Sequence, residues 1–141
     1  MFLVDTNVIS EARKGLRANL GVRTFLRVTP PEKLYLAVQT IGEIRRGQRQ
    51  IAHRGDTEQA ARLNTWIDGI INDYHDRILD FDLDCAQIWG SLLSPNPQHS
   101  IDKQIAAIAL IHRMTVVTWN TADFLGTGVT VLNPFTPSAQ T

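Results

Sequence analysis

The chain has 141 residues, of which 43% are hydrophobic and 20% charged, as in one soluble globular domain with a single sizeable core. Its 14 basic and 14 acidic residues cancel, so the overall charge gives no sign of nucleic-acid binding, although a local basic patch is compatible with this total. The single cysteine, Cys85, excludes an internal disulfide framework. Because no secretory signal and no membrane-spanning apolar stretch is found, we expect a cytoplasmic protein without membrane contact.

The first half of the chain alternates short apolar segments with helical patterns. Residues 2–4, with the sequence FLV, are apolar throughout, as in a strand buried on both faces of a parallel sheet. Gly15 is a stop signal for the helical pattern that follows this strand. In chain order we predict a strand at 2–4, helices at 6–14 and 17–28, a strand at 34–38 and a helix at 40–51.

The second half continues the same alternation. Between residues 56 and 74 an apolar stripe recurs with a period of about 3.6 residues, which predicts a long amphipathic helix. The helical pattern at 101–112 is apolar nearly all round from Ile105 to Ile111, so this helix should be buried, with Ser100 as its cap. The remaining predicted elements are strands at 78–82, 115–119 and 129–133 and a helix at 83–93.

This order of elements predicts an α/β fold. Strands that alternate with helices form right-handed crossovers and a parallel sheet covered on both faces. We therefore expect a three-layer α/β/α sandwich with a short parallel central sheet, built as a single domain over residues 1–134, with a loose tail at 135–141. Ligands of such folds bind outside the carboxyl ends of the strands.

Four acidic residues fall at such positions. Asp5 and Asp123 follow predicted strands, while Glu43 and Asp102 lie in the first turns of predicted helices. Each has an ordinary alternative: a helix or turn cap for Asp5 and Asp123, an ion pair with Arg46 for Glu43, and a helix-dipole contact for Asp102. On an ideal helix, however, Glu43 and Asp102 lie at the margin of the apolar face, where side chains line a groove.

Carboxylates brought together in this way repel one another unless a cation neutralises them. Oxygen ligands select hard ions, which predicts Mg²⁺ or Mn²⁺. The histidines show no ligand spacing, and we expect none of them to be a ligand; His112 should pack against the sheet at a helix end. The four histidines are His53, His75, His99 and His112.

Four motifs together resemble those of the PIN-domain nucleases and, more narrowly, the VapC-type toxins of bacterial toxin–antitoxin pairs, including the FitB-like branch. They are LVDTNVISE, AVQTIGEIRRG, SIDKQIAAIAL and TWNTADF, in the family's order and spacing over nearly the whole chain. The resemblance implies a PIN-like fold in which Asp5, Glu43 and Asp102 are the principal catalytic and metal-site residues. It assigns Asp123 to a second metal or to positioning water.

The resemblance also implies a set of residues that support the acids: Thr6, Asn7, Thr118 and Asn120. The chain departs from the family at Trp119, where an arginine is common. Two roles are open for this tryptophan, stacking on a base and buried packing at the strand end.

The activity implied by the resemblance is metal-dependent cleavage of RNA phosphodiester bonds, in tRNA or another structured RNA, by a toxin. Its expected partners are a small DNA-binding antitoxin and a second copy of the chain in a homodimer. Arg45, Arg46 and Arg49 flank Glu43 and are candidate RNA contacts, with a solvated helix face as the alternative.

Two other classes of protein also gather acids at strand ends. A receiver-type signalling domain needs an acidic pair after its first strand and a late lysine, but Thr6 follows Asp5 and no lysine follows Lys103. A haloacid-dehalogenase-like phosphatase needs Asp-x-Asp, but residue 7 is Asn7. A non-catalytic binding module whose acidic groove receives basic side chains would use the same carboxylates, and this alternative stays open.

Overall fold

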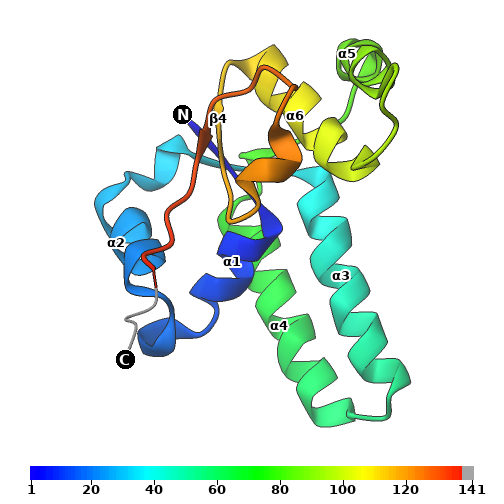
Figure 1. Cartoon of the computed structure of the whole chain (residues 1–141). Coiled ribbons are helices and arrows are strands. Elements are labelled where there is room, and N and C mark those ends of the chain that lie inside the picture. Colours follow the sequence, from blue (N-terminus) through cyan, green and yellow to red (C-terminus); the bar gives the residue numbers. More distant parts are fainter. Residues whose placement is uncertain (138–141) are drawn as a thin grey trace.

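The sheet is built outward from the first strand. β1 (Phe2–Val4) lies at its centre and pairs in parallel with β2 (Leu34–Ala37) on one side and β4 (Thr115–Val117) on the other. β3 (Ile78–Leu79) and β5 (Val131–Leu132) form the edges, which gives the order β3-β2-β1-β4-β5 with every pairing parallel. The computed structural model describes residues 1–137 (Figure 1).

Successive apolar residues of the central strands point to opposite faces of the sheet and form two cores. Leu3 and Val116 pack with the helices α5 (Leu83–Leu93) and α6 (Ser100–His112) on one face. Val4 and Val117 pack on the other face with residues of α1, α2 and α4. These helices span Thr6–Ala12, Leu20–Val28 and Thr57–Asp73. The predicted three-layer α/β/α sandwich is thus confirmed, and it leaves the carboxyl ends of β1 and β4 side by side.

Helix α4 runs beside α3 (Val38–His53), and the two extend together away from the sheet (Figure 1). Gly55, with φ +89°, allows the tight turn between them, and Asp56 caps α4 by accepting the backbone N–H of Gln59. The buried amide of Gln48 on α3 donates a hydrogen bond to the Ala60 carbonyl oxygen on α4 at 3.2 Å. This bond joins α3 to α4 near the turn between the two helices.

Several local predictions differ from the structure. The predicted strands 78–82, 115–119 and 129–133 are longer than the observed β3, β4 and β5, because only some of their residues pair with a neighbouring strand. The cap of α6 is His99, in the left-handed backbone conformation, and Ser100 is already helical. α2 begins at Leu20 because residues 15–17 form the 3₁₀ helix η1 (Gly15–Arg17) and Asn19 caps α2. The predicted strand 34–38 ends one residue early, since α3 already starts at Val38.

A further correction concerns His112. It ends α6 as predicted but is exposed and does not pack against the sheet, because the face of α6 that meets the sheet carries Ile105 and Ile108. Two more 3₁₀ helices, η2 (Pro31–Lys33) and η3 (Thr121–Phe124), complete the secondary structure of residues 1–137. No helix in this described part of the chain is long and apolar enough to cross a membrane.

Part of the segment predicted to be a loose tail, 135–141, makes defined contacts. The ring of Phe135 lies edge-on to Trp119 with 4.6 Å between centroids. Asn19 accepts the backbone N–H of Thr136 at 2.9 Å, and Gly21 is needed beneath this segment because a Cβ there would lie 2.1 Å from the Pro134 carbonyl oxygen. Residues 138–141 lie outside the described part.

Candidate active site

Asp5 stands directly after β1, where the chain leaves the centre of the sheet. It is buried, with 5% of its surface exposed, and it caps α1 by accepting the backbone N–H of Thr6 on Oδ1 at 2.8 Å. Asp5 therefore does serve as a helix cap, but the capping bond uses only one of its two carboxylate oxygens.

The second oxygen of Asp5 is held by side chains from two elements. The fully buried Thr118, after β4, donates its hydroxyl to Asp5 Oδ2 at 2.9 Å, and Asn7 Nδ2 donates to the same oxygen at 3.3 Å. The Thr118 hydroxyl accepts bonds from Asn7 Nδ2 and from the Asn120 backbone N–H, and Asn7 Oδ1 accepts the Trp119 backbone N–H. This network joins the carboxyl ends of the two neighbouring strands and fixes the orientation of Asp5.

Glu43 approaches the same point from the second turn of α3. Thr6 donates its hydroxyl to Glu43 Oε1 at 2.8 Å, so this one residue bonds Asp5 through its backbone and Glu43 through its side chain. Of the four residues expected to support the acids, Thr6, Asn7 and Thr118 bond them directly, whereas Asn120 contributes only its backbone N–H, to the Thr118 hydroxyl.

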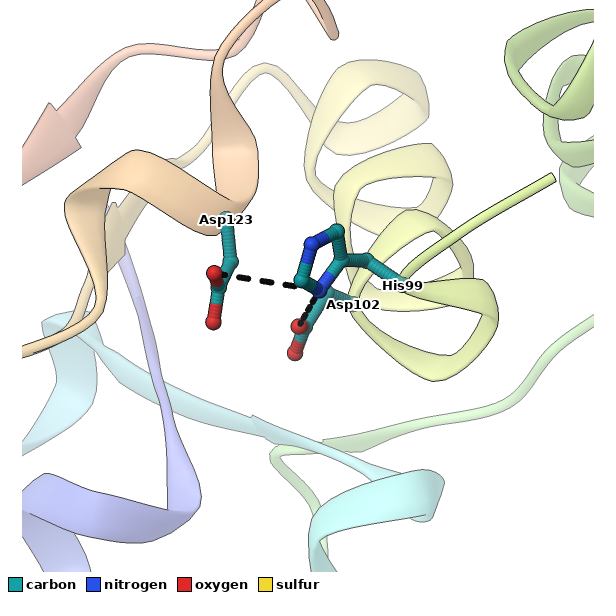
Figure 2. A group of neighbouring side chains, drawn as sticks. All are labelled: His99, Asp102 and Asp123. Carbon is teal, nitrogen blue, oxygen red and sulfur yellow. Dashed lines mark ion pairs between the residues drawn. The ribbon is translucent and has the colours of Figure 1, made fainter. Parts of the chain in front are cut away.

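The other two acids meet around a histidine. Asp102 lies in the first turn of α6, and Asp123 lies in η3 after β4. Figure 2 shows the His99 ring beside both carboxylates, with Nδ1 at 3.7 Å from Asp102 Oδ2 and 3.7 Å from Asp123 Oδ1. One potential ligand atom from each of the three residues lies within 4.8 Å of the others.

The charges of the four acids act on one another. Burial, and then the nearby carboxylates of Asp5, Asp123 and Glu43, raise the pKa of Asp102 from 3.8 to about 6. Such coupling shows that the charges of the four groups act on one another through the protein. The predicted quartet, Asp5, Glu43, Asp102 and Asp123, is therefore one electrostatic cluster in the fold, although its members span most of the sequence.

Burial also raises the pKa of Asp5, while the hydrogen bonds from Thr6, Thr118 and Asn7 oppose this shift. The pKa of Glu43 is raised by loss of hydration at its carboxylate, although the residue as a whole is exposed; the Thr6 hydroxyl opposes the shift. Both groups are thus easier to protonate than a free carboxylate.

This donor set fits a divalent cation. Clustered carboxylates whose pKa values are raised by one another regain their ordinary acidity when a cation lies among them. Carboxylate oxygens are the preferred ligands of Mg²⁺ and Mn²⁺. Among the residues described, His99, Asp102 and Asp123 bring potential ligand atoms within 4.8 Å of one another, and the charges of Asp5 and Glu43 act on Asp102 from the same end of the sheet.

His99 is the residue at this site that sequence reasoning missed. The expectation that no histidine is a ligand rested on spacing to other histidines, whereas the relevant spacing is His99 to Asp102, three residues on. The side chain of a helix-cap residue faces that of the residue three positions later across the first turn. A histidine at a cap followed three residues later by an aspartate is therefore the sequence pattern that indicates this pair.

The three arginines near Glu43 differ in their surroundings. Arg45 donates to Asn64 Oδ1 on α4 at 2.7 Å and lies 3.9 Å from Asp68, so its guanidinium faces the neighbouring helix. Arg46 and Arg49 are exposed. The charge of Arg46 acts on the Glu43 carboxylate one turn earlier, and Arg49 lies a further turn along α3.

Trp119 follows Thr118 directly and is 54% exposed, so it is not buried packing at the strand end. Its backbone N–H is bonded to Asn7, and its ring packs edge-on against Phe135 in a groove that Glu11 and Arg17 also line. A large exposed aromatic ring held by a second ring is a flat surface available for stacking.

With this geometry described, we compared the chain with known proteins. It is 32% identical to the plasmid stability protein StbB of Pseudomonas syringae pv. tomato and 33% identical to the toxin FitB of Neisseria gonorrhoeae, each over 96% of this chain and 99% of the relative. It is 28% identical to the VapC ribonuclease Y4jK of Sinorhizobium fredii over 98% of this chain and 100% of the relative. No protein-family model matches the chain.

Comparison with solved structures points to the same group of proteins. The structure of FitAcB from Neisseria gonorrhoeae superimposes with a TM-score of 0.84 at 32% identity, covering 95% of this chain and 98% of that chain. The structure of FitAB bound to an IR36 DNA fragment gives a TM-score of 0.79 at 33% identity, covering 95% of both chains. On sequence and structure together, the chain belongs to the VapC/FitB family of PIN-domain toxins.

Proposed function

We propose that this protein is the toxin of a bacterial toxin–antitoxin pair and a metal-dependent endoribonuclease that cleaves RNA phosphodiester bonds in tRNA or another structured RNA. The nuclease role is supported by the relatives named VapC ribonuclease and toxin FitB. One observation carries the chemical part of the proposal. Asp5 is held in a fixed orientation by Thr6, Asn7 and Thr118, within a cluster of acids that raise the pKa of Asp102.

In this proposal Asp5, Glu43 and Asp102 hold the ion, Mg²⁺ or Mn²⁺, and Asp123 holds a second ion or positions water. A divalent ion at such a site supplies activation of water and neutralises charge on the phosphate. The protein residues do the positioning. Thr118 and Asn7 hold Oδ2 of Asp5 in place, and Thr6 links Asp5 to Glu43 by bonding both.

RNA binding in this proposal uses the surface beside the acids. Arg46 and Arg49 are exposed on α3 and are assigned phosphate contacts, whereas Arg45 stabilises the pair α3 and α4. Trp119 is assigned stacking on one base of the bound strand. Single-stranded or looped RNA suits this arrangement, because its bases can be splayed out to reach a recessed site.

We further propose that a small DNA-binding antitoxin inhibits the protein by laying its C-terminal segment across the site, with an Arg or Lys near Asp5 and Glu43. A groove between α1, α3 and α4 opens next to Glu43; its lining includes Thr6, Ile44 and Trp66. The groove combines apolar side chains with the acidic Glu43 and the basic Arg13, a mixture that suits an amphipathic segment with its basic residue at the Glu43 end. The proposal also includes a cytoplasmic location and a homodimer of the toxin.

Cleavage of a labelled single-stranded RNA by the purified protein tests the function. We expect cleavage with Mn²⁺ or Mg²⁺, none with a chelator, and none from Asp5→Asn or Asp102→Asn at any metal concentration. Asp76→Asn is the matched control, because Asp76 is exposed, lies in the loop before β3 at the opposite end of the sheet and pairs only weakly with Arg77. It should cleave RNA like the parent.

Circular dichroism of each variant separates loss of chemistry from loss of fold. If Asp5→Asn unfolds, then the capping bond to Thr6 is its main role, and Asp102→Asn decides the catalytic assignment. If folded parent protein binds the antitoxin but never cleaves RNA in the presence of metal, the acidic groove is a binding module and the enzymatic proposal is wrong.

A further inference from the structure

His99 occupies a backbone conformation that few residues other than glycine adopt. Its φ of 57° and ψ of 47° place it in the left-handed region, immediately before the first residue of α6. This conformation turns the chain from the loop into the helix and carries the imidazole to the side where Asp102 and Asp123 lie (Figure 2). With an ordinary helix cap, the side chain of residue 99 would bond the helix itself; here no such capping bond is made.

The backbone on both sides of His99 is anchored. Lys103 is buried and donates its Nζ to the Asn96 carbonyl oxygen, which ties the preceding loop to the first turn of α6. The backbone N–H of Lys103 donates to the His99 carbonyl oxygen at 2.9 Å. On the other side, the Trp89 indole N–H donates to the Ser100 carbonyl oxygen at 3.0 Å. The imidazole is therefore presented from a fixed support and not from a free loop.

The separations of the three groups suit shared coordination of one ion. His99 Nδ1 lies 3.7 Å from one oxygen of Asp102 and 3.7 Å from one oxygen of Asp123. Ligand atoms about 2.1 Å from a six-coordinate ion lie about 3 Å apart when adjacent and about 4.2 Å apart when opposite. The two histidine distances fall between these values, and the Asp102 and Asp123 oxygens lie within 4.8 Å of each other, so a shift of the side chains toward one another would let all three bind one ion.

We propose that His99 is a nitrogen ligand of the metal site and makes this site prefer Mn²⁺ to Mg²⁺. This inference rests on the proposed function, since it concerns the same metal. Imidazole nitrogen binds first-row transition ions well and Mg²⁺ poorly, whereas carboxylate oxygens bind both. A site with four carboxylates alone would discriminate little between Mn²⁺ and Mg²⁺. The added nitrogen raises the affinity for Mn²⁺ and leaves the affinity for Mg²⁺ nearly unchanged.

Pulsed electron paramagnetic resonance of Mn²⁺ bound to the full chain tests the ligand directly, without RNA. The parent protein should show coupling of Mn²⁺ to a directly bound ¹⁴N nucleus. His99→Asn should lose this coupling, and Asn is a suitable replacement because it tolerates the left-handed conformation. His112→Asn, at the exposed far end of the same helix, is the matched control and should keep it.

Calorimetric titrations test the preference. We expect the parent to bind Mn²⁺ at least about tenfold more tightly than Mg²⁺, and His99→Asn to lose about tenfold for Mn²⁺ while changing less than about twofold for Mg²⁺. His99→Gly, which also suits a positive φ, repeats the test if the Asn variant folds poorly.

Three results would overturn the inference. If Mn²⁺ binds the parent and RNA is cleaved but no ¹⁴N coupling appears, His99 is not a ligand, while the proposed function stands. If His99→Asn weakens both ions equally, the residue only shapes the site. If the folded parent binds no Mn²⁺ at millimolar concentration, both this inference and the metal-dependent function fail.

Discussion

Replacing Asp102 with asparagine should stabilise the metal-free protein at neutral pH. Burial and the neighbouring carboxylates raise the pKa of Asp102 from 3.8 to about 6, so its ionised form is less stable in the fold than in the unfolded chain. The native state binds the extra proton, and the free energy of unfolding therefore falls as the pH rises from about 4 to about 6. Below about pH 4 the group is protonated in both states and the penalty is absent.

The loss of folding stability caused by ionised Asp102 can be calculated from the shift of its pKa. A difference of about two pKa units corresponds to about 3 kcal/mol without screening. Because 28% of the Asp102 side chain is exposed, solvent screens part of it, and we expect about 1–2 kcal/mol. Asparagine has the same shape without the charge, so Asp102→Asn should gain this amount at pH 7 and nothing at pH 4.

Urea unfolding followed by circular dichroism, in a chelator at pH 4, 5, 6 and 7, measures the effect, with Asp76→Asn as the control for loss of one surface charge. The reasoning is refuted if Asp102→Asn is less stable than the parent by a constant amount at every pH. That result would show that Asp102 chiefly complements the positive end of α6, which is its ordinary alternative.

The remaining predictions concern the network, the metal and RNA. Thr118→Val should lower the free energy of unfolding in urea by about 1–2 kcal/mol, because it leaves buried Asp5 Oδ2 short of a donor; an unchanged value would show that this bond is dispensable. Mn²⁺ should raise the melting temperature in scanning calorimetry, increasingly with concentration, and a flat response would argue against a metal site. Trp119→Ala should weaken binding of single-stranded RNA about tenfold by fluorescence anisotropy, whereas Trp119→Tyr should not; equal losses would exclude stacking.

The layers of the fold are largely predictable because they follow from local apolar patterns. The fully apolar FLV at 2–4 becomes β1 at the sheet centre, and the nearly all-apolar pattern after Ile105 becomes the buried part of α6. The convergence of Asp5 and Asp102 is predictable too, since parallel strands end at one edge of the sheet.

Details that depend on long-range contacts were not predictable. The left-handed conformation of His99 accompanies the bond by which Lys103 holds the preceding loop to α6, and neither feature follows from the local pattern of residue types. Likewise, Arg45 turns to α4 because Asn64 and Asp68 happen to lie opposite, which no pattern within α3 reveals. The partner of the exposed Trp119 ring is Phe135, sixteen residues further along the chain, which no local pattern reveals.

Asp5 shows how an ordinary role and a functional one coexist in a single side chain. One oxygen caps α1 through Thr6, as local sequence patterns suggest, and the other is fixed by Thr118, which is 113 residues away in sequence. Only the first bond can be predicted from the neighbouring residues in the sequence. The second bond exists because β1 and β4 are neighbours in the sheet.

An anomalous difference map from crystals of the protein soaked in Mn²⁺ tests the central claim most directly. We expect one principal peak among the carboxylates of Asp5, Glu43, Asp102 and Asp123, within about 2.3 Å of at least two of their oxygens, and its loss in Asp102→Asn crystals. A map in which Mn²⁺ binds elsewhere, or in which this cluster stays empty at saturating Mn²⁺, would contradict the assignment of the acids as the metal site.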